Sequence, residues 1–196
     1  MMLKFVLVAG ALMVASTGLS AQEASLRCPV QGSKVERTNL PTIAYRGADP
    51  ASPLVCLDQA RQPRFLGYWS TQSAFFNAGG KQLLSTFADW KGDGPSRVVN
   101  IDYFGSDRYG NSTTANEKWQ ILGQEKVDVH AGSFDAVKVR RIFSVVGTSY
   151  IFTETLWIDR ASGTPVKSVV DHMNATMSPD VTSWQATEVI TRPSGS

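Results

Sequence analysis

Residues Val137-Lys-Val-Arg-Arg-Ile-Phe-Ser-Val-Val-Gly-Thr-Ser-Tyr-Ile-Phe-Thr-Glu-Thr-Leu-Trp-Ile158 have the pattern of a β-hairpin. Two runs rich in β-branched and aromatic residues flank Val146–Ser149, a short segment whose Gly147 suits a turn. With the turn placed there, the strands pair Val145 with Tyr150, Phe143 with Phe152, Arg141 with Glu154 and Val139 with Leu156. Cross-strand aromatic and opposite-charge pairs each contribute roughly 0.2 to 1 kcal/mol. We therefore predict this register, with the paired side chains on an apolar face and a wetter face that carries Lys138, Arg140, Ile142, Thr153, Thr155 and Trp157.

The same residue preferences continue on both sides of the hairpin. From Arg97 onward, runs of Val, Ile, Thr, Phe, Tyr and Trp alternate with short turn-forming segments. Short connections are typical of antiparallel strands. The pattern predicts an antiparallel meander over 97–190, with strands at about 97–104, 117–122, 125–130, 135–145, 150–158, 165–173 and 181–190.

The residues before these strands contain one helical pattern and a turn-rich start. A helix over about 81–90, after Gly79-Gly80, is predicted because one face would carry Leu83, Leu84, Phe87 and Trp90. Residues 22–62 are rich in Pro, Gly, Ser and Asp, so we expect an irregular lead-in there.

The first 21 residues have the pattern of a cleavable secretory signal. Lys4 precedes an apolar stretch from Phe5 to about Ala15, and small residues precede Gln22. The stretch is too short for a lasting membrane span, and no amphipathic pattern supports the alternative of a buried core helix. We expect cleavage before Gln22, leaving one β-rich domain (22–196) that is periplasmic or secreted and has no membrane span.

Charge and cysteine content narrow the classes of partner and site. The formal charge of +2 falls by one with the loss of Lys4, so nothing indicates a nucleic-acid partner. The chain has two cysteines, Cys28 and Cys56, and export favours their oxidation. The two cysteines are too far apart in the sequence for a typical redox pair, and a zinc site needs more ligands. Arg27, which precedes Cys28, does not suit lipid attachment, which requires a small residue at that position. We expect a single structural disulfide between Cys28 and Cys56.

Two segments resemble a signature of uncharacterised exported bacterial proteins. They are Val127-Asp-Val-His-Ala-Gly-Ser-Phe-Asp-Ala-Val-Lys-Val139 and Thr155-Leu-Trp-Ile-Asp-Arg-Ala-Ser-Gly-Thr-Pro-Val-Lys167. The first is similar to V-x-V-P-A-G-T-F-x-x-x-K-V and the second to Y-W-Y-D-x-x-T-G-x-P-V-K. This chain departs from the signature at His130, Ser133 and Ile158.

The resemblance covers about residues 85–170 and implies a fold rather than a reaction. It implies a curved antiparallel sheet with one or two short helices, similar in outline to the incomplete barrels of periplasmic lipoprotein carriers. A sheet of this kind can hold an acyl chain. The expected fold class is therefore α+β, mainly β, with a disulfide-stapled N-terminal segment, and the resemblance supplies no catalytic residues.

Catalytic and metal-binding patterns are incomplete in this chain. Gly147-Thr-Ser-Tyr-Ile151 lacks the final glycine of a nucleophile elbow. His130 and His172 each lie in a predicted strand near a single acid, without the spacing of a metal site. We predict no catalytic residue, no metal ion and no cofactor.

The aromatic residues of the strands are the remaining candidates for a binding site. We predict a binding face formed by Phe143, Tyr150, Phe152 and Leu156; these residues could instead be core, and both readings stay open. The leading hypothesis is a non-enzymatic exported protein that binds an apolar small molecule or lipid. The alternatives are a module that docks on an envelope protein and, third, a hydrolase with a nonstandard site.

Overall fold

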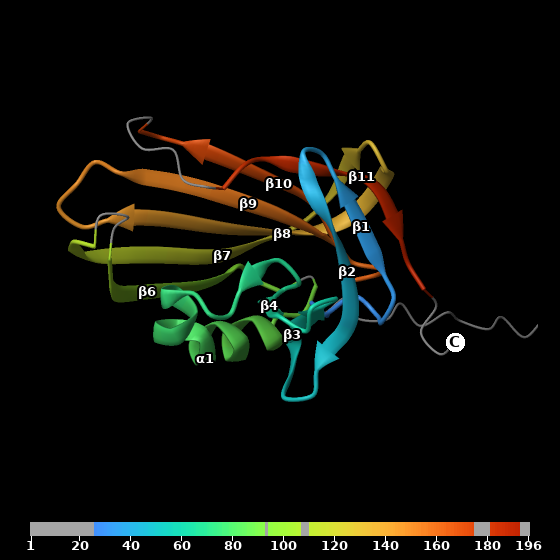
Figure 1. Ribbon diagram of the computed structural model, residues 1–196, viewed down its shortest axis with the longest axis horizontal. Coiled ribbons are helices and arrows are strands. Elements are labelled where there is room, and N and C mark those ends of the chain that lie inside the picture. The colour runs from blue at the N-terminus through green and yellow to red at the C-terminus, as the bar shows by residue number, and fades with distance from the viewer. Residues whose placement is uncertain (1–25, 93, 107–109, 175–180, 193–196) are drawn as a thin grey trace, which may run out of the picture.

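A computed structural model describes residues 26–92, 94–106, 110–174 and 181–192 (Figure 1). The predicted signal (1–21) and the cleavage site before Gln22 lie outside the described residues. No helix in the described part of the chain is long and apolar enough to cross a membrane.

The described residues form one sheet of eleven antiparallel strands and one helix, α1 (Ala74–Ala88). The first strands are β1 (Lys34–Arg37), β2 (Leu40–Asp49), β3 (Ser52–Asp58), β4 (Pro63–Phe65) and β5 (Trp69–Ser70). After the helix come β6 (Arg97–Ser106), β7 (Ser112–Val129), β8 (Gly132–Val145), β9 (Ile151–Asp159), β10 (Pro165–His172) and β11 (Trp184–Ile190). The predicted fold class is confirmed.

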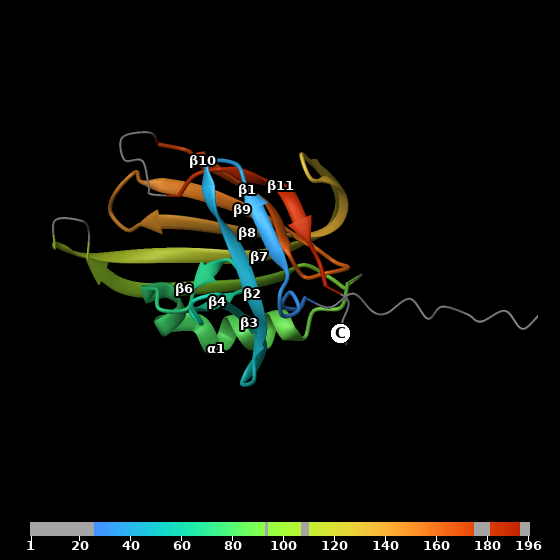
Figure 2. The same cartoon turned by 45° about the vertical axis from the view of Figure 1, so that its right-hand side comes forward.

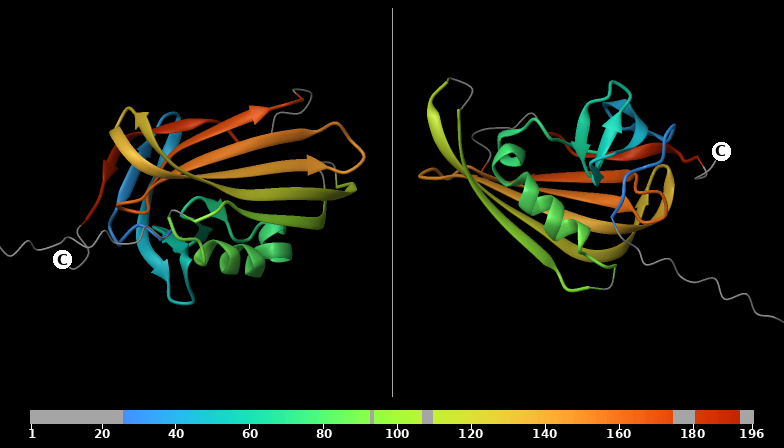
Figure 3. Two further views of the ribbon diagram at one scale, coloured as in Figure 1. Left: turned by 180° about the vertical axis from the view of Figure 1, so that it is seen from behind. Right: turned by 90° about the horizontal axis from the view of Figure 1, so that it is seen from below.

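The order of the strands explains why the sheet forms an incomplete barrel. Across the sheet the order is β5-β4-β3-β2-β1-β11-β10-β9-β8-β7-β6, so consecutive strands are neighbours and β1 pairs with β11. The two edges are therefore β5 and β6, the strands that α1 connects. The helix packs on β6, β3 and β7, and Figures 2 and 3 show it on the concave side of the curled sheet. The result is a half-barrel with α1 against its open side.

The predicted register of the central hairpin is confirmed. In β8 and β9, Phe143 pairs with Phe152, Arg141 with Glu154 and Val139 with Leu156. The amide of Val145 also donates to the carbonyl of Tyr150 across the turn. The register of β8 with β9 is therefore determined by the length of the turn between them and by the alternation of side chains along each strand.

The prediction of an irregular lead-in over 22–62 is wrong from Lys34 onward, where β1, β2 and β3 lie. Several side chains of these strands reach the core, including Val35, Ile43 and Tyr45. The glycines and prolines mark irregularities within the sheet: Gly47, with φ of +95°, lies at a shift of the β2–β3 register, and Pro50 lies in the turn that follows β2. Such residues are compatible with strands at bulges and turns.

The prediction of a helix over 81–90 places the start of α1 too late, because glycine has a low helix propensity and a glycine pair favours a helix boundary. Both glycines lie inside the helix and are buried. A Cβ on Gly79 would lie 2.5 Å from Cδ1 of Ile101 on β6. The glycine is needed for close packing of the helix on the sheet, which is a tertiary cause that local sequence does not reveal.

The predicted strands at 117–122 and 125–130 are one long strand, β7. The register with β8 shifts between Ile121 and Gly123, and Gly123 has a φ of +116°. The glycine interpreted as a turn is therefore a β-bulge, which lets a long strand bend with the curvature of the sheet.

Aromatic side chains fill the space between α1 and the sheet. Trp119 of β7 lies 4.7 Å from Trp69 and 5.8 Å from Phe65, measured between ring centroids. Phe65 also lies 5.6 Å from Phe87 of the helix. All four rings are buried. The protein's own side chains therefore occupy the concave side beneath the helix.

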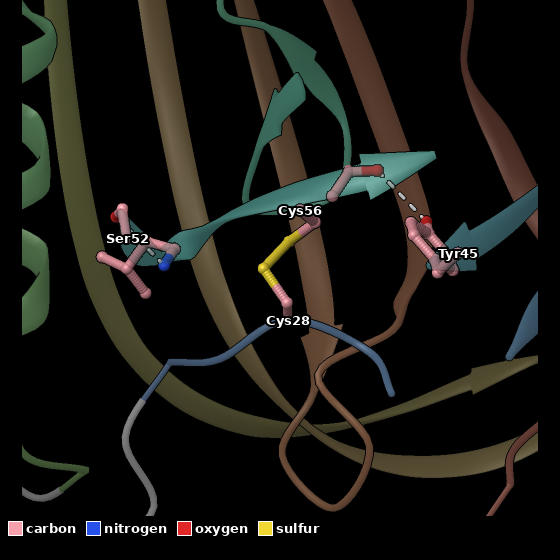
Figure 4. The surroundings of a disulfide bond; sticks show 6 residues. Cys28, Tyr45, Ser52 and Cys56 are labelled. Carbon is pink, nitrogen blue, oxygen red and sulfur yellow. Dashed lines mark hydrogen bonds between the residues drawn. A yellow bond between two sulfur atoms is a disulfide. The ribbon is translucent and has the colours of Figure 1, made fainter. Parts of the chain in front are cut away.

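The predicted disulfide between Cys28 and Cys56 is confirmed. It links the segment before β1 to β3, as Figure 4 shows, across a sequence separation of 28 residues. A bridge that closes a loop of this length contributes roughly 3 to 4 kcal/mol in the chain-entropy estimate. A structural disulfide fits a protein that folds in an oxidising compartment.

Candidate functional site

The concave face of β6 to β10 carries the candidate site in successive layers across the sheet. One layer places Glu117 beside Phe143 and Phe143 beside Phe152. The next places Trp119 beside Arg141 and Arg141 beside Glu154. Since side chains two residues apart on a strand share a face, aromatic and charged groups meet on this side of the sheet.

Three rings form what we call the open-end aromatic cluster: Phe143, Tyr150 and Phe152. Phe143 stacks on Phe152 at 5.1 Å, and Tyr150 lies 5.9 Å from Phe143 and 6.3 Å from Phe152. Phe143 and Tyr150 are half-buried, whereas Phe152 is only 4% exposed. None of the three belongs to the main hydrophobic core.

Leu156, the fourth residue of the predicted binding face, has a different environment. It is on the same face, but it is fully buried and part of the main core. The structure therefore brings Phe143, Tyr150 and Phe152 together at one place and puts Leu156 deeper, out of reach of a ligand at the cluster.

A buried charge network, formed by Arg141, Glu117 and Glu154, lies directly next to the cluster. Arg141 donates from Nε and Nη2 to the two carboxylate oxygens of Glu117, at 2.8 and 2.6 Å. Its Nη1 lies 3.6 Å from Oε2 of Glu154. The Arg141 side chain is 12% exposed and both glutamates are buried. The Arg141–Glu154 contact is the opposite-charge pair predicted from the hairpin register.

Uncharged donors complete the network. The Tyr103 hydroxyl and Trp119 Nε1 donate to Glu117, at 2.7 and 2.8 Å. Trp69 Nε1 donates to Oε2 of Glu154 at 2.7 Å, and the Ser168 hydroxyl donates to Oε1 at 3.4 Å. All four carboxylate oxygens thus accept a hydrogen bond, which offsets the cost of burying two charges.

Aromatic rings also surround the guanidinium of Arg141. Its central carbon lies 4.9 Å from the ring centroid of Phe75, 5.4 Å from Phe152 and 5.9 Å from Phe143. Rings at these distances attract a cation through their electron-rich faces. The charge network therefore forms the inner boundary of the open-end aromatic cluster.

The electrostatics keep the arginine and the tyrosines of this region in their ordinary protonation states at neutral pH. Burial acts to lower the pKa of Arg141, but its hydrogen bonds to Glu117 and the charges of Glu117 and Glu154 raise that pKa more. Burial and the nearby Glu117 charge raise the pKa of Tyr103. Burial and the Glu154 charge raise the pKa of Tyr68 to about 12. Arg141 thus stays a cation and Tyr103 stays a hydrogen-bond donor.

The carboxylates of this network are buried away from solvent. Glu154 and Ser168 form a contact between a carboxylate and a hydroxyl, and both residues are fully buried. Among the residues the structure describes, no three His, Cys, Asp or Glu side chains gather as metal ligands. His172 instead lies 6.3 Å from Phe152, and His130 lies beside Gln185.

Sequence reasoning missed Glu117, its indole partner Trp119, and the indole partner of Glu154, which is Trp69. One signal was present: Glu117 has the same parity as Ala115, Trp119 and Ile121, which are apolar. A charged residue at an inward position of a strand indicates a buried partner. The partner Trp69 could not be found in this way, because it lies 85 residues from Glu154 in the sequence.

No protein-family model, no curated protein and no solved structure matches the chain. The resemblance to exported bacterial proteins therefore remains a hypothesis. The curled, antiparallel half-barrel that the resemblance implied is present.

Proposed function

We propose that the protein is exported and binds an apolar or lipid-like ligand, without catalysing a reaction, at the open-end aromatic cluster of the half-barrel. The observation that carries the proposal is the half-buried state of Phe143 and Tyr150 on a concave face. Aromatic rings that are neither packed into the main core nor fully exposed are typical walls of small-molecule sites.

The buried charge network supports an apolar ligand rather than a charged one at this place. Every carboxylate oxygen of Glu117 and Glu154 already accepts a hydrogen bond within the protein. Arg141 is held by two acids and by the surrounding rings. A polar ligand group would have to replace these contacts, whereas an alkyl chain needs only contact with the rings.

Phe143→Ala is expected to weaken the binding of a fluorescent polyene fatty acid by about tenfold, because the substitution removes a ring worth roughly 1 to 3 kcal/mol of apolar contact. The measurement is a fluorescence titration of the oxidised protein. Ile142→Ala is the matched control, since Ile142 is half-buried on the opposite face of the same strand. Equal affinities of wild type and Phe143→Ala would contradict binding at the cluster.

An envelope-protein partner is the second candidate, favoured by the outer face of the edge strand β6. Phe104 is 84% exposed there and Val98 is 44% exposed. An edge strand with exposed apolar residues is a common surface for strand addition by a partner. A protein that co-purifies through this edge, with no ligand at the aromatic cluster, would favour this function.

A further inference from the structure

A second concave site lies among the first strands, away from the aromatic cluster. It is an open groove of about 640 Å³, lined by residues of β1 to β4 and the turns between them. This volume lies within the range of small-molecule sites. Its charged side chains are Arg37, Arg64 and Asp58, and its apolar surface includes Ile43 and Ala60.

Arg37 is held in place without a counter-charge. Its Nε and Nη2 donate to the carbonyl of Pro41, at 3.0 and 2.6 Å, and its guanidinium carbon lies 5.2 Å from the centroid of the Trp184 ring. Among the described residues no carboxylate lies within ion-pair distance of Arg37, and its Nη1 has no hydrogen-bond partner. The side chain is therefore oriented, yet one donor edge remains available.

The carboxylate in the groove is already committed to other donors. Asp58 accepts from Nε of Arg64 at 2.8 Å and from the backbone amides of Ala60 and Gln62, at 2.9 Å each. It balances Arg64 and leaves the positive charge of Arg37 uncompensated.

The charges of the groove favour an added anion. Burial lowers the pKa of Arg37, and the neighbouring Arg64 acts in the same direction. An anion bound at the groove would stabilise the partly buried cation of Arg37 and would offset the unfavourable effect of Arg64. A planar guanidinium with a free edge matches a carboxylate better than it matches a spherical ion.

We propose that this groove binds a small organic carboxylate, with Arg37 and Arg64 holding the carboxylate group and the apolar part of the ligand lying along Ile43 and Ala60. The proposal is independent of the ligand proposed for the aromatic cluster, since the two sites share no residue. The groove would bind a negatively charged group, whereas the cluster would bind an apolar one. Tyr68 lines the groove as well, and its hydroxyl accepts a hydrogen bond from Trp184 Nε1 at 3.2 Å. The Trp184 indole signal is therefore a local reporter.

The test is an NMR titration of the isotope-labelled, oxidised protein with hexanoate and, separately, with 1-hexanol. Hexanoate is expected to shift the Trp184 indole signal and the Arg37 Nε–H signal saturably, whereas hexanol is not. Arg37→Gln should weaken hexanoate binding by about tenfold or more, as expected for loss of a charge-assisted hydrogen bond. Arg61→Gln is the matched control, because Arg61 is exposed and lies outside the groove; its effect should stay within about twofold.

Thr42→Trp gives a second variant that keeps all charges and fills the groove from an exposed lining position. It should abolish the hexanoate-induced shifts. Equal binding of hexanol and hexanoate, or unchanged binding by folded Arg37→Gln and Thr42→Trp, would overturn the proposal. Hexanoate-induced shifts that are confined to the signals of Phe143 and Tyr150 would also overturn the proposal for the groove. Such a result would leave the proposed function of the aromatic cluster intact.

Discussion

Arg141→Met is expected to lower the free energy of unfolding by about 3 to 5 kcal/mol, the cost of removing one partner from a buried ion pair. Methionine fills a similar volume, so the loss reports charge rather than a cavity. Without the guanidinium, the buried carboxylates of Glu117 and Glu154 would lose the hydrogen bonds and the counter-charge that Arg141 provides. Denaturant unfolding followed by circular dichroism measures the change.

Arg140→Met is the matched control for this substitution. Arg140 is the neighbouring residue on the opposite face of β8, where it donates to Oε1 of Gln120 at 3.0 and 3.2 Å. Its replacement should cost no more than about 1 kcal/mol. Adding Glu117→Gln and Glu154→Gln to Arg141→Met should recover part of the stability, because neutral amides can be buried at lower cost. Equal losses for Arg141→Met and Arg140→Met would show that the charge network does not stabilise the fold.

Phe152→Ala is expected to cost about 3 to 5 kcal/mol, the usual range for truncating a buried phenylalanine. Phe152 is 4% exposed, stacks on Phe143 and lies 5.4 Å from the Arg141 guanidinium carbon. Its loss would leave a cavity and expose the charge network to water. Unfolding of the ligand-free protein gives the relevant value.

Thr153→Ala is the control for Phe152, because Thr153 is half-buried on the outer face of the same strand. Its effect should stay within about 1 kcal/mol. Similar costs for the two variants would contradict the packing of Phe152. A small cost for Phe152→Ala together with lost ligand retention would instead make Phe152 part of the ligand wall.

The parts of the fold that depend on neighbouring residues in the sequence could be predicted. The register of Phe143 with Phe152 follows from one turn and from alternation along two strands. The same register places Arg141 next to Glu154, so this ion pair also follows from the local sequence. Local pairing of this kind is set by turn geometry and by the side-chain period.

The parts that depend on distant residues could not be predicted. Gly79 is tolerated within α1 because Ile101 of β6 packs where a Cβ would lie. Trp69 of β5 donates to Glu154 of β9 although the two strands are far apart in the order of the curled sheet. The residues of 34–58 form strands because β1 pairs with β11, almost at the other end of the chain. Each of these contacts joins segments whose proximity is a product of the finished fold.

Native mass spectrometry of the protein purified from its own cell envelope, followed by organic extraction, tests ligand binding most directly. We expect wild-type protein to carry one apolar molecule per chain, Ile142→Ala to carry the same molecule, and Phe143→Ala to have lost most of it. The proposed binding at the open-end aromatic cluster would be contradicted if purified wild-type protein carried no bound molecule. It would also be contradicted if Phe143→Ala retained as much bound apolar molecule per chain as wild type.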